Sequence, residues 1–170
     1  MPGEPFFYAG LRLSELSALD MADVEMSARR GRLKVRTGKG DAYREVPLNS
    51  ATRKALDEWV HARADQLAAL AEAGGSVDAH VPALWLSRSG RRMSSRAVDL
   101  VVRRLATAAN LELSAHVLRH TFVTNLIRSG ADVVLVAEIA GHRRLDTTRR
   151  YSLPSQADKD AAVEAVLVEI

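Results

Sequence analysis

Cysteine is absent from the 170 residues of this sequence, which excludes disulfide frameworks, cysteine-ligated zinc and thiol catalysis. No apolar run approaches the length of a membrane span, and the N-terminal MPGEPFFYAG lacks the layout of a signal peptide. Hydrophobic residues make up 47% and charged residues 26%, a balance typical of a globular domain with a sizeable core. We therefore predict one cytoplasmic domain over residues 1–170, with no membrane association.

Lysine is also scarce, because only four of the 24 basic residues are lysine and 20 are arginine. The planar guanidinium group binds phosphate oxygens in pairs, so the excess of arginine favours a nucleic-acid or nucleotide partner. A high-GC coding bias would enrich arginine, alanine and valine in the same way. Composition alone leaves both explanations open.

Periodicity predicts a mainly α-helical α+β fold with a small antiparallel sheet of two to three strands in the N-terminal third. A helix is expected to start in LRLSELSALDMADV (11–24) and to end near Asp20–Asp23. The segments RLKVRT (32–37) and AYREVPL (42–48) alternate like strands around the turn TGKGD. Polar caps and terminal glycines predict four more helices: from Asn49 or Ser50 to about Glu72, from Ser94 or Ser95 to about Ala109, from Ser114 to Gly130, and from Asp132 to Gly141. A short helix starting near Asp146 and a final helix over 156–170, with an apolar stripe, complete the expected order.

The segment HVLRH places His116, Arg119 and His120 on one helix face, because residues three and four apart lie side by side. A histidine pair at this spacing could bind zinc, but an intervening arginine is a poor neighbour for a divalent cation. A permanent cation beside a titratable donor suits an oxyanion better. The alternative interpretation is a surface arginine with two core histidines.

Two further cations stand out. Arg12 lies among apolar residues at a helix start, where its burial would be costly unless an anion met it. Glu15 is three residues further on, so a plain helical ion pair is the simple explanation. Lys39, on the turn TGKGD, is either a solvated tip or a mobile ammonium that delivers a proton or a charge to a ligand.

The segment GHRRLDTTRRY (141–151) places His142 and two arginine pairs close to Tyr151 in the chain. A phenol has a pKa near ~10, so its attack at neutral pH needs a nearby proton acceptor and concentrated positive charge. The paired arginines are equally compatible with contacts to neighbouring phosphates and with a merely solvated role. They are Arg143, Arg144, Arg149 and Arg150.

The order and spacing of these groups resemble the tyrosine recombinases, also called the phage integrase family. GLRLSEL resembles the first-arginine motif of that family, VRTGKGDAYREVPL its lysine hairpin, and HVLRH and GHRRLDTTRRY its HxxRH and GH…Y boxes. The resemblance covers nearly the whole chain. Ala115 and Val117 stand where proline and a polar residue are common, and neither departure touches a reacting atom.

The resemblance implies a site-specific recombinase or integrase that cuts and rejoins DNA strands through a 3′-phosphotyrosyl intermediate, without metal, ATP or another cofactor. The implied catalytic roles are the nucleophile Tyr151, the phosphate ligands Arg12 and Arg119, the general acid Lys39, the phosphate donor and proton acceptor His116, and the further phosphate donor His142. Glu15 would orient the cations, and His120 would pack rather than react.

The resemblance also implies a prokaryotic, nucleoid-associated protein that forms a tetramer on double-stranded DNA. We expect a monomer or weak dimer without DNA, with residues 156–170 docked on a neighbouring protomer or on their own core. Family members usually carry an N-terminal DNA-binding domain, which we expect to be absent because eleven residues precede Arg12. Two hypotheses from other classes are a non-catalytic DNA-binding remnant and a metal hydrolase that uses His116 and His120.

Overall fold

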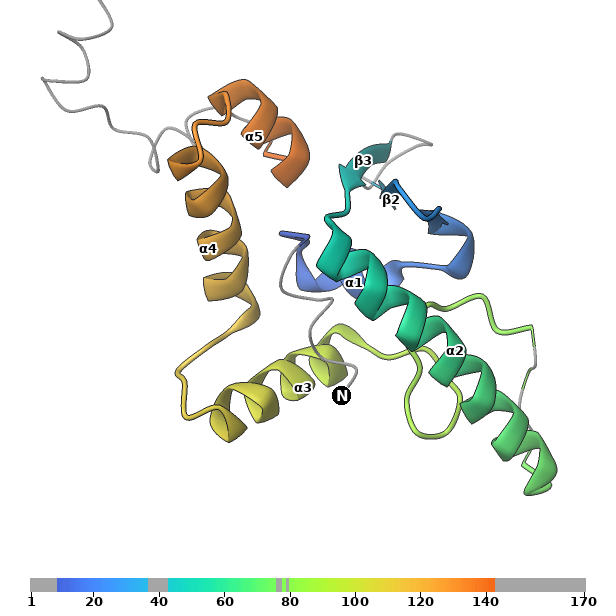
Figure 1. Ribbon diagram of the computed structural model, residues 1–170. Helices are drawn as coiled ribbons and strands as arrows, with labels where there is room; N and C mark the ends of the chain where they lie inside the picture. Colours follow the sequence, from blue (N-terminus) through green and yellow to red (C-terminus); the bar gives the residue numbers. More distant parts are fainter. Residues whose placement is uncertain (1–8, 37–42, 76–77, 79, 143–170) are drawn as a thin grey trace, which may run out of the picture.

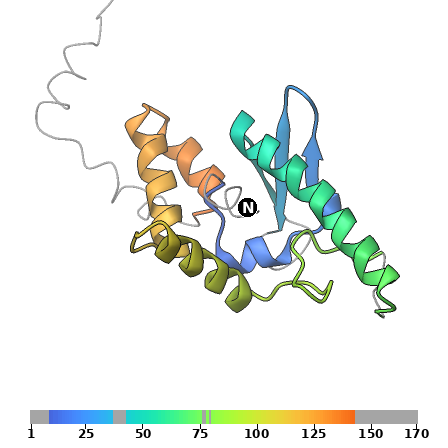
Figure 2. The ribbon, with the colours of Figure 1, turned by 60° about the horizontal axis from the view of Figure 1, so that its bottom comes forward.

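The computed structural model describes residues 9–36, 43–75, 78 and 80–142. Its elements, in chain order, are α1 (Leu13–Ala18), the 3-10 helix η2 (Met21–Asp23), β1 (Val24–Met26), β2 (Gly31–Arg36), β3 (Tyr43–Pro47), α2 (Ser50–Glu72), α3 (Ser95–Ala108), α4 (Ala115–Arg128) and α5 (Val133–Ala140). Figures 1 and 2 show the sheet and α2 on one side of the molecule, α4 and α5 on the other, and α1 between them. The predicted mainly helical α+β fold is confirmed.

The sheet has three antiparallel strands in the order β1-β2-β3. Leu33 pairs with Val46 and Val35 with Arg44 in the hairpin of β2 and β3. Leu33, Val35 and Val46 are at most 3% exposed, so alternate side chains of this hairpin face the core, as the sequence pattern predicted. The remaining strand, β1, extends the hairpin through the pairing of Val24 with Leu33.

The first helix is shorter than predicted, because α1 ends at Ala18. The Leu19 carbonyl accepts a hydrogen bond from Leu84 N at 2.9 Å, and Met21 N donates to Pro82 O at 2.8 Å. These long-range bonds take the backbone groups that a continuing helix would have used. The expectation of helix beyond Ala18 is therefore wrong, and the following residues form η2 and β1.

The other helix starts are confirmed by their caps. Asn49, Ser94, Ser114 and Asp132 each accept a backbone N–H from the first turn of the helix that follows, at distances between 2.8 and 3.3 Å. Gly141 ends α5 with a left-handed φ of 66°, which favours glycine. These signals fix the placement of α4 and α5, on which two of the singled-out motifs lie.

The described part of the chain packs around a main core and two smaller clusters. The main core joins α1, the inner face of the sheet, α2 and α3, and its members include Leu16, Val46, Leu56 and Val98. One smaller cluster joins the C-terminal part of α2 to the loop that follows it. The other joins α4 and α5 through Val123, Val136 and Ala140. The α4–α5 pair also contacts β3 and the segment that precedes α1. None of the described helices is long and apolar enough to cross a membrane.

Candidate active site

Arginines from three separate segments converge on the C-terminal end of α5. Three successive carbonyl oxygens each accept a hydrogen bond from a different arginine: Ile139 O from Arg44 Nε at 3.0 Å, Ala140 O from Arg119 Nη2 at 2.6 Å, and Gly141 O from Arg12 Nη2 at 2.9 Å. The last carbonyls of a helix lack partners within the helix and carry the negative end of its dipole. The end of α5 therefore anchors these three guanidinium groups, which we call the arginine cluster (Arg12, Arg44 and Arg119).

Glu15 links two members of the arginine cluster. Its carboxylate accepts from Arg12 Nη1 at 2.8 Å and from the Arg12 backbone N at 2.9 Å. Arg44 donates to the same carboxylate in a bidentate pair, at 2.9 and 2.8 Å. The predicted pair of Arg12 and Glu15 is thus present, but it is part of a three-residue network rather than a plain helical ion pair.

The Glu15 carboxylate is ionised at neutral pH. Its side chain is 10% exposed, and burial on its own would raise its pKa. The hydrogen bonds from Arg44 and Arg12 and the charge of Arg44 outweigh burial and lower the pKa of Glu15 to about 2. Glu15 thus neutralises part of the charge of the arginine cluster and holds Arg12 in a fixed orientation.

Arg44 was not singled out from the sequence, although its side chain is only 8% exposed. The alternating pattern of AYREVPL could have indicated that Arg44 is buried, because it places Arg44 on the same inward face as Val46. A buried guanidinium needs an anionic partner, so an inward-facing arginine in a strand points to a site. Gly141 permits the close approach, since a Cβ there would lie 2.6 Å from Arg44 Nη1.

A groove of about 370 Å³ brings together candidate residues from the segment before α1, from α4 and from the end of α5. Its charged and titratable lining consists of Arg12, His116, Arg119, His120 and His142. His116 and His120 are exposed, whereas Arg119 is half-buried. The alternative of two core histidines beside a surface arginine is therefore wrong, and the expectation that His120 packs rather than reacts stays a prediction.

His142 follows directly after the anchor at the end of α5, and its backbone N donates to Ala137 O at 2.9 Å. Burial lowers the pKa of its imidazole, and the positive charges of Arg119, Arg12 and Arg44 lower it further. The imidazole is neutral at pH 7 and offers both a donor and an acceptor nitrogen. The three positive charges that contribute to this shift also make the potential in the groove positive, which favours an anion there.

The two histidines of α4 were also candidates for a zinc site. Within the described residues, no group of three or more histidine, aspartate and glutamate side chains is arranged to hold a metal ion. His120 Nδ1 instead lies 3.4 Å from Thr124 Oγ1. Arg119 puts a guanidinium beside both imidazoles in the groove, which suits an oxyanion.

Some predictions fall outside the described residues. They concern the general acid Lys39, the nucleophile Tyr151, the short helix near Asp146 and the helix over 156–170. The four arginines expected to contact DNA are also outside them: Arg143, Arg144, Arg149 and Arg150. The structure brings six candidate residues together: Arg12, Glu15, His116, Arg119, His120 and His142.

The chain thus combines a mainly helical domain and a three-stranded sheet with a groove lined by arginines and histidines, a lining whose chemistry suits an oxyanion. The profile of the phage integrase family matches residues 5–157, so the chain belongs to that family. The tyrosine recombinase XerC of Pseudomonas aeruginosa (strain UCBPP-PA14) is 37% identical over 150 residues, which cover 88% of this chain and 45% of the relative. XerC of Natranaerobius thermophilus is 35% identical over 156 residues, which cover 91% and 50%.

Solved recombinase structures share the fold. The pre-cleavage complex of the XerH site-specific recombinase bound to difH substrate matches with a TM-score of 0.75 and 27% identity, over 94% of this chain and 44% of that chain. The XerA recombinase matches with a TM-score of 0.71 and 26% identity, over 96% and 56%. The predicted tyrosine recombinase catalytic core is confirmed as the fold. The chain spans about half the length of the curated relatives it matches.

Proposed function

We propose that this chain is the catalytic domain of a site-specific DNA recombinase or integrase. It would cut and rejoin strands of double-stranded DNA by transesterification, through a 3′-phosphotyrosyl intermediate. The observation that carries the proposal is that Arg12 and Arg119, held by carbonyls at the end of α5, line one groove together with His116 and His142. Membership of the phage integrase family and the likeness to XerC proteins support it.

In the proposed reaction, the phenolic oxygen of Tyr151 attacks the scissile phosphorus while the bond from phosphorus to the 5′-oxygen breaks. His116 accepts the phenol proton, and Lys39 protonates the departing 5′-oxygen. The phosphodiester becomes a phosphotyrosyl ester of similar energy, so a 5′-hydroxyl can reverse the step without ATP. The places of Lys39 and Tyr151 in this scheme follow from their motifs in the sequence.

The described residues would stabilise the transition state by preorganisation. Arg12 and Arg119 would donate to the non-bridging oxygens of the phosphate, where negative charge accumulates. Both are already held by α5 carbonyls, so little conformational entropy is lost when the phosphate binds. Arg12 remains 44% exposed at the groove, and neutral His142 adds a further donor.

Double-stranded DNA is the proposed partner, and a tetramer on DNA is the proposed assembly. The expected contacts of Arg143, Arg144, Arg149 and Arg150 with DNA and the docking of residues 156–170 between protomers belong to this proposal. So do a nucleoid-associated location and the assignment of residues 1–170 as one catalytic domain. We expect a monomer or weak dimer by light scattering without DNA; a stable DNA-free tetramer would contradict this part.

Covalent capture tests the chemistry directly. A pool of duplexes with a randomised core and a nick near its centre would trap a DNA adduct that survives SDS, because the short fragment released at the nick diffuses away. The adduct should disappear in Tyr151→Phe and fall by roughly a hundredfold or more in Arg12→Ala and Arg119→Ala. Arg104→Ala, an exposed change on α3, should leave the yield unchanged.

The alternative is a DNA-binding remnant without activity. It predicts salt-sensitive binding of the same duplexes but no adduct with any member of the pool. An adduct that persists in Tyr151→Phe would mean that another residue is the nucleophile and would refute the assigned role of Tyr151.

A further inference from the structure

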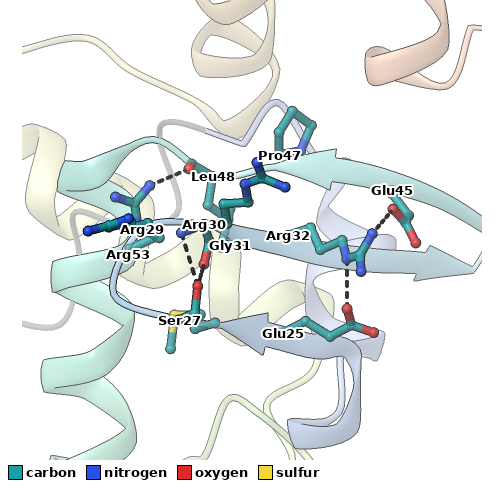
Figure 3. A pocket seen from close by; sticks show the side chains of 11 residues that line it. Glu25, Ser27, Arg29, Arg30, Gly31, Arg32, Glu45, Pro47, Leu48 and Arg53 are labelled. Atoms are coloured by element: carbon teal, nitrogen blue, oxygen red, sulfur yellow. Dashed lines mark hydrogen bonds and ion pairs between the residues drawn. The ribbon is translucent and has the colours of Figure 1, made fainter.

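A second basic hollow lies away from the groove, at the turn between β1 and β2. It has a volume of about 740 Å³ and shares no lining residue with the groove. We call it the basic pocket (Arg29, Arg30, Arg32 and Arg53), after the four arginines that line it. Figure 3 shows Arg29 and Arg53 at one end of the basic pocket and Arg32 further along β2.

Arg32 is already neutralised within the basic pocket. Its Nε donates to Glu25 at 2.6 Å and its Nη1 to Glu45 at 2.8 Å, as the dashed lines of Figure 3 mark. Glu25 also pairs with Lys34. Both carboxylates of the lining are therefore engaged with Arg32 and Lys34, and neither pairs with the other three arginines.

Arg53 is held in place without a carboxylate. Its Nη1 donates to Leu48 O at 2.9 Å. The aliphatic part of its side chain packs against Gly31 of β2. A Cβ built on Gly31 would lie only 2.8 Å from Arg53 Cδ. The absence of a side chain at Gly31 thus makes room for Arg53 against the strand, and the guanidinium is fixed at the pocket wall.

Arg29 and Arg30 lie on a turn that is closed by three hydrogen bonds. Ser27 N donates to Arg30 O at 2.8 Å, Ser27 Oγ donates to the same oxygen at 3.0 Å, and Arg30 N donates to Ser27 Oγ at 3.1 Å. Both side chains are exposed. Within the ranges that the structure describes, neither they nor Arg53 forms an ion pair with a carboxylate.

An adjoining hollow of about 530 Å³ shares Met26, Ser27 and Arg53 with the basic pocket. It adds Lys54 and Asp57, whose charges cancel, so the excess of positive charge lies on Arg29, Arg30 and Arg53. Several arginines along one hollow suit a ligand that presents phosphates in series better than they suit a single small anion. Guanidinium forks match phosphate oxygens in bidentate pairs.

We propose that the basic pocket binds backbone phosphates of duplex DNA at a site separate from the groove where cleavage is proposed. This inference rests on the proposed function, because that function supplies DNA as the ligand. Contacts to the backbone carry no sequence information, so the basic pocket contributes affinity and orientation rather than choice of target.

The test compares two double variants that remove the same charge. Arg29→Ala/Arg30→Ala removes the two turn arginines, and Arg88→Ala/Arg91→Ala removes two exposed arginines from the loop before α3. Binding of a 30-base-pair duplex is measured by fluorescence anisotropy over a series of NaCl concentrations. We expect the slope of log affinity against log salt to fall by about two in the pocket variant and to stay unchanged in the control.

A second variant tests the geometry without loss of charge. Gly31→Ala displaces Arg53 from its place on β2 and should lower the salt slope by about one. Inorganic triphosphate and a synthetic peptide of residues 156–170 serve as competitors that represent a free polyphosphate and an acidic protein segment. Thermal unfolding of each variant separates loss of binding from loss of fold.

The results of these measurements distinguish DNA binding at the basic pocket from the alternatives. Equal slopes in the wild type and the pocket variant, or an equal loss in the control, overturn the proposal. The proposal is also overturned if the peptide or triphosphate binds tightly through Arg29 and Arg30 and the salt slope for DNA is the same in the wild type and the pocket variant. Because binding is measured without cleavage, a reduced slope with no covalent adduct refutes the proposed function alone, whereas an adduct with unchanged slopes refutes the basic pocket alone.

Discussion

Gly141 lies against the guanidinium of Arg44 so closely that a Cβ built on the glycine would fall 2.6 Å from Nη1 and 2.7 Å from Cζ. Arg44 comes from β3, whereas Gly141 ends α5. Their contact joins the sheet to the α4–α5 pair at the point where the groove is formed. The residue before His142 therefore has to be glycine for two reasons, its left-handed backbone and the space that Arg44 occupies.

Gly141→Ala should destabilise the protein more than glycine substitutions elsewhere. A left-handed φ costs a non-glycine residue about 1–2 kcal/mol, and the clash with Arg44 adds to this cost. Gly74→Ala and Gly130→Ala are matched controls, because both have positive φ with open space around the new Cβ. Urea unfolding should show an excess loss of about 2 kcal/mol for Gly141→Ala. Equal losses in all three variants would show that Arg44 does not constrain this position.

Arg44→Met should be strongly destabilising, although Arg44 touches no predicted substrate atom. It leaves the largely buried carboxylate of Glu15 with Arg12 as its remaining cationic partner, and removal of one member of a buried pair costs roughly 3–5 kcal/mol. Adding Glu15→Gln to this variant should restore part of the loss, since the uncompensated charge is gone. Urea unfolding of both single variants and the double variant gives the coupling free energy. Additive losses would contradict the network.

Stability should fall in acid through Glu15. Its pKa is about 2 in the folded protein, below the ordinary value of 4.5, so the unfolded state binds more protons between these two values. The stabilisation is present above pH 4.5 and is lost as the pH falls towards 2. We expect this group to contribute about 2 kcal/mol after allowance for solvent screening. Urea unfolding at a series of pH values should show a flatter profile for Glu15→Gln than for the wild type.

The His142 imidazole should titrate below its ordinary range in solution. The unfolded state then binds more protons than the folded state, so stability should rise with pH up to about 6.5 through this group. NMR titration of the imidazole should show its pKa moving upward in Arg12→Ala, because a repelling charge is removed. Lys54→Ala on α2 serves as the control and should leave the His142 pKa unchanged. Vanadate, a phosphate mimic, should raise this pKa if it binds in the groove.

Local chemistry made much of this fold predictable from the sequence. Asn49, Ser94, Ser114 and Asp132 cap their own helices, so each start depends on residues that are close in the chain. The helical spacing of HVLRH likewise predicted that His116 and Arg119 share one face, and both line the groove. These features need no information from distant parts of the molecule.

Features set by distant partners were missed. Val24–Met26 form a strand only because β2 offers an edge, and three residues are too few to show a period. The helix that was expected to continue past Ala18 gives way to hydrogen bonds with Pro82 and Leu84. Arg44 belongs to the site only through its bonds to Glu15 and to the end of α5, which lie 29 and 95 residues away in the chain. Periodicity within a single element cannot supply such partners.

The bonds that gather the arginine cluster span 129, 95 and 21 positions of the chain and all end within three consecutive residues. Closing loops over such separations costs chain entropy, which the rest of the native packing has to offset. A partly folded or locally opened chain therefore lacks the concentrated positive charge that the proposed DNA cleavage needs. In the proposed function, this arrangement confines DNA cleavage to the native state of the domain.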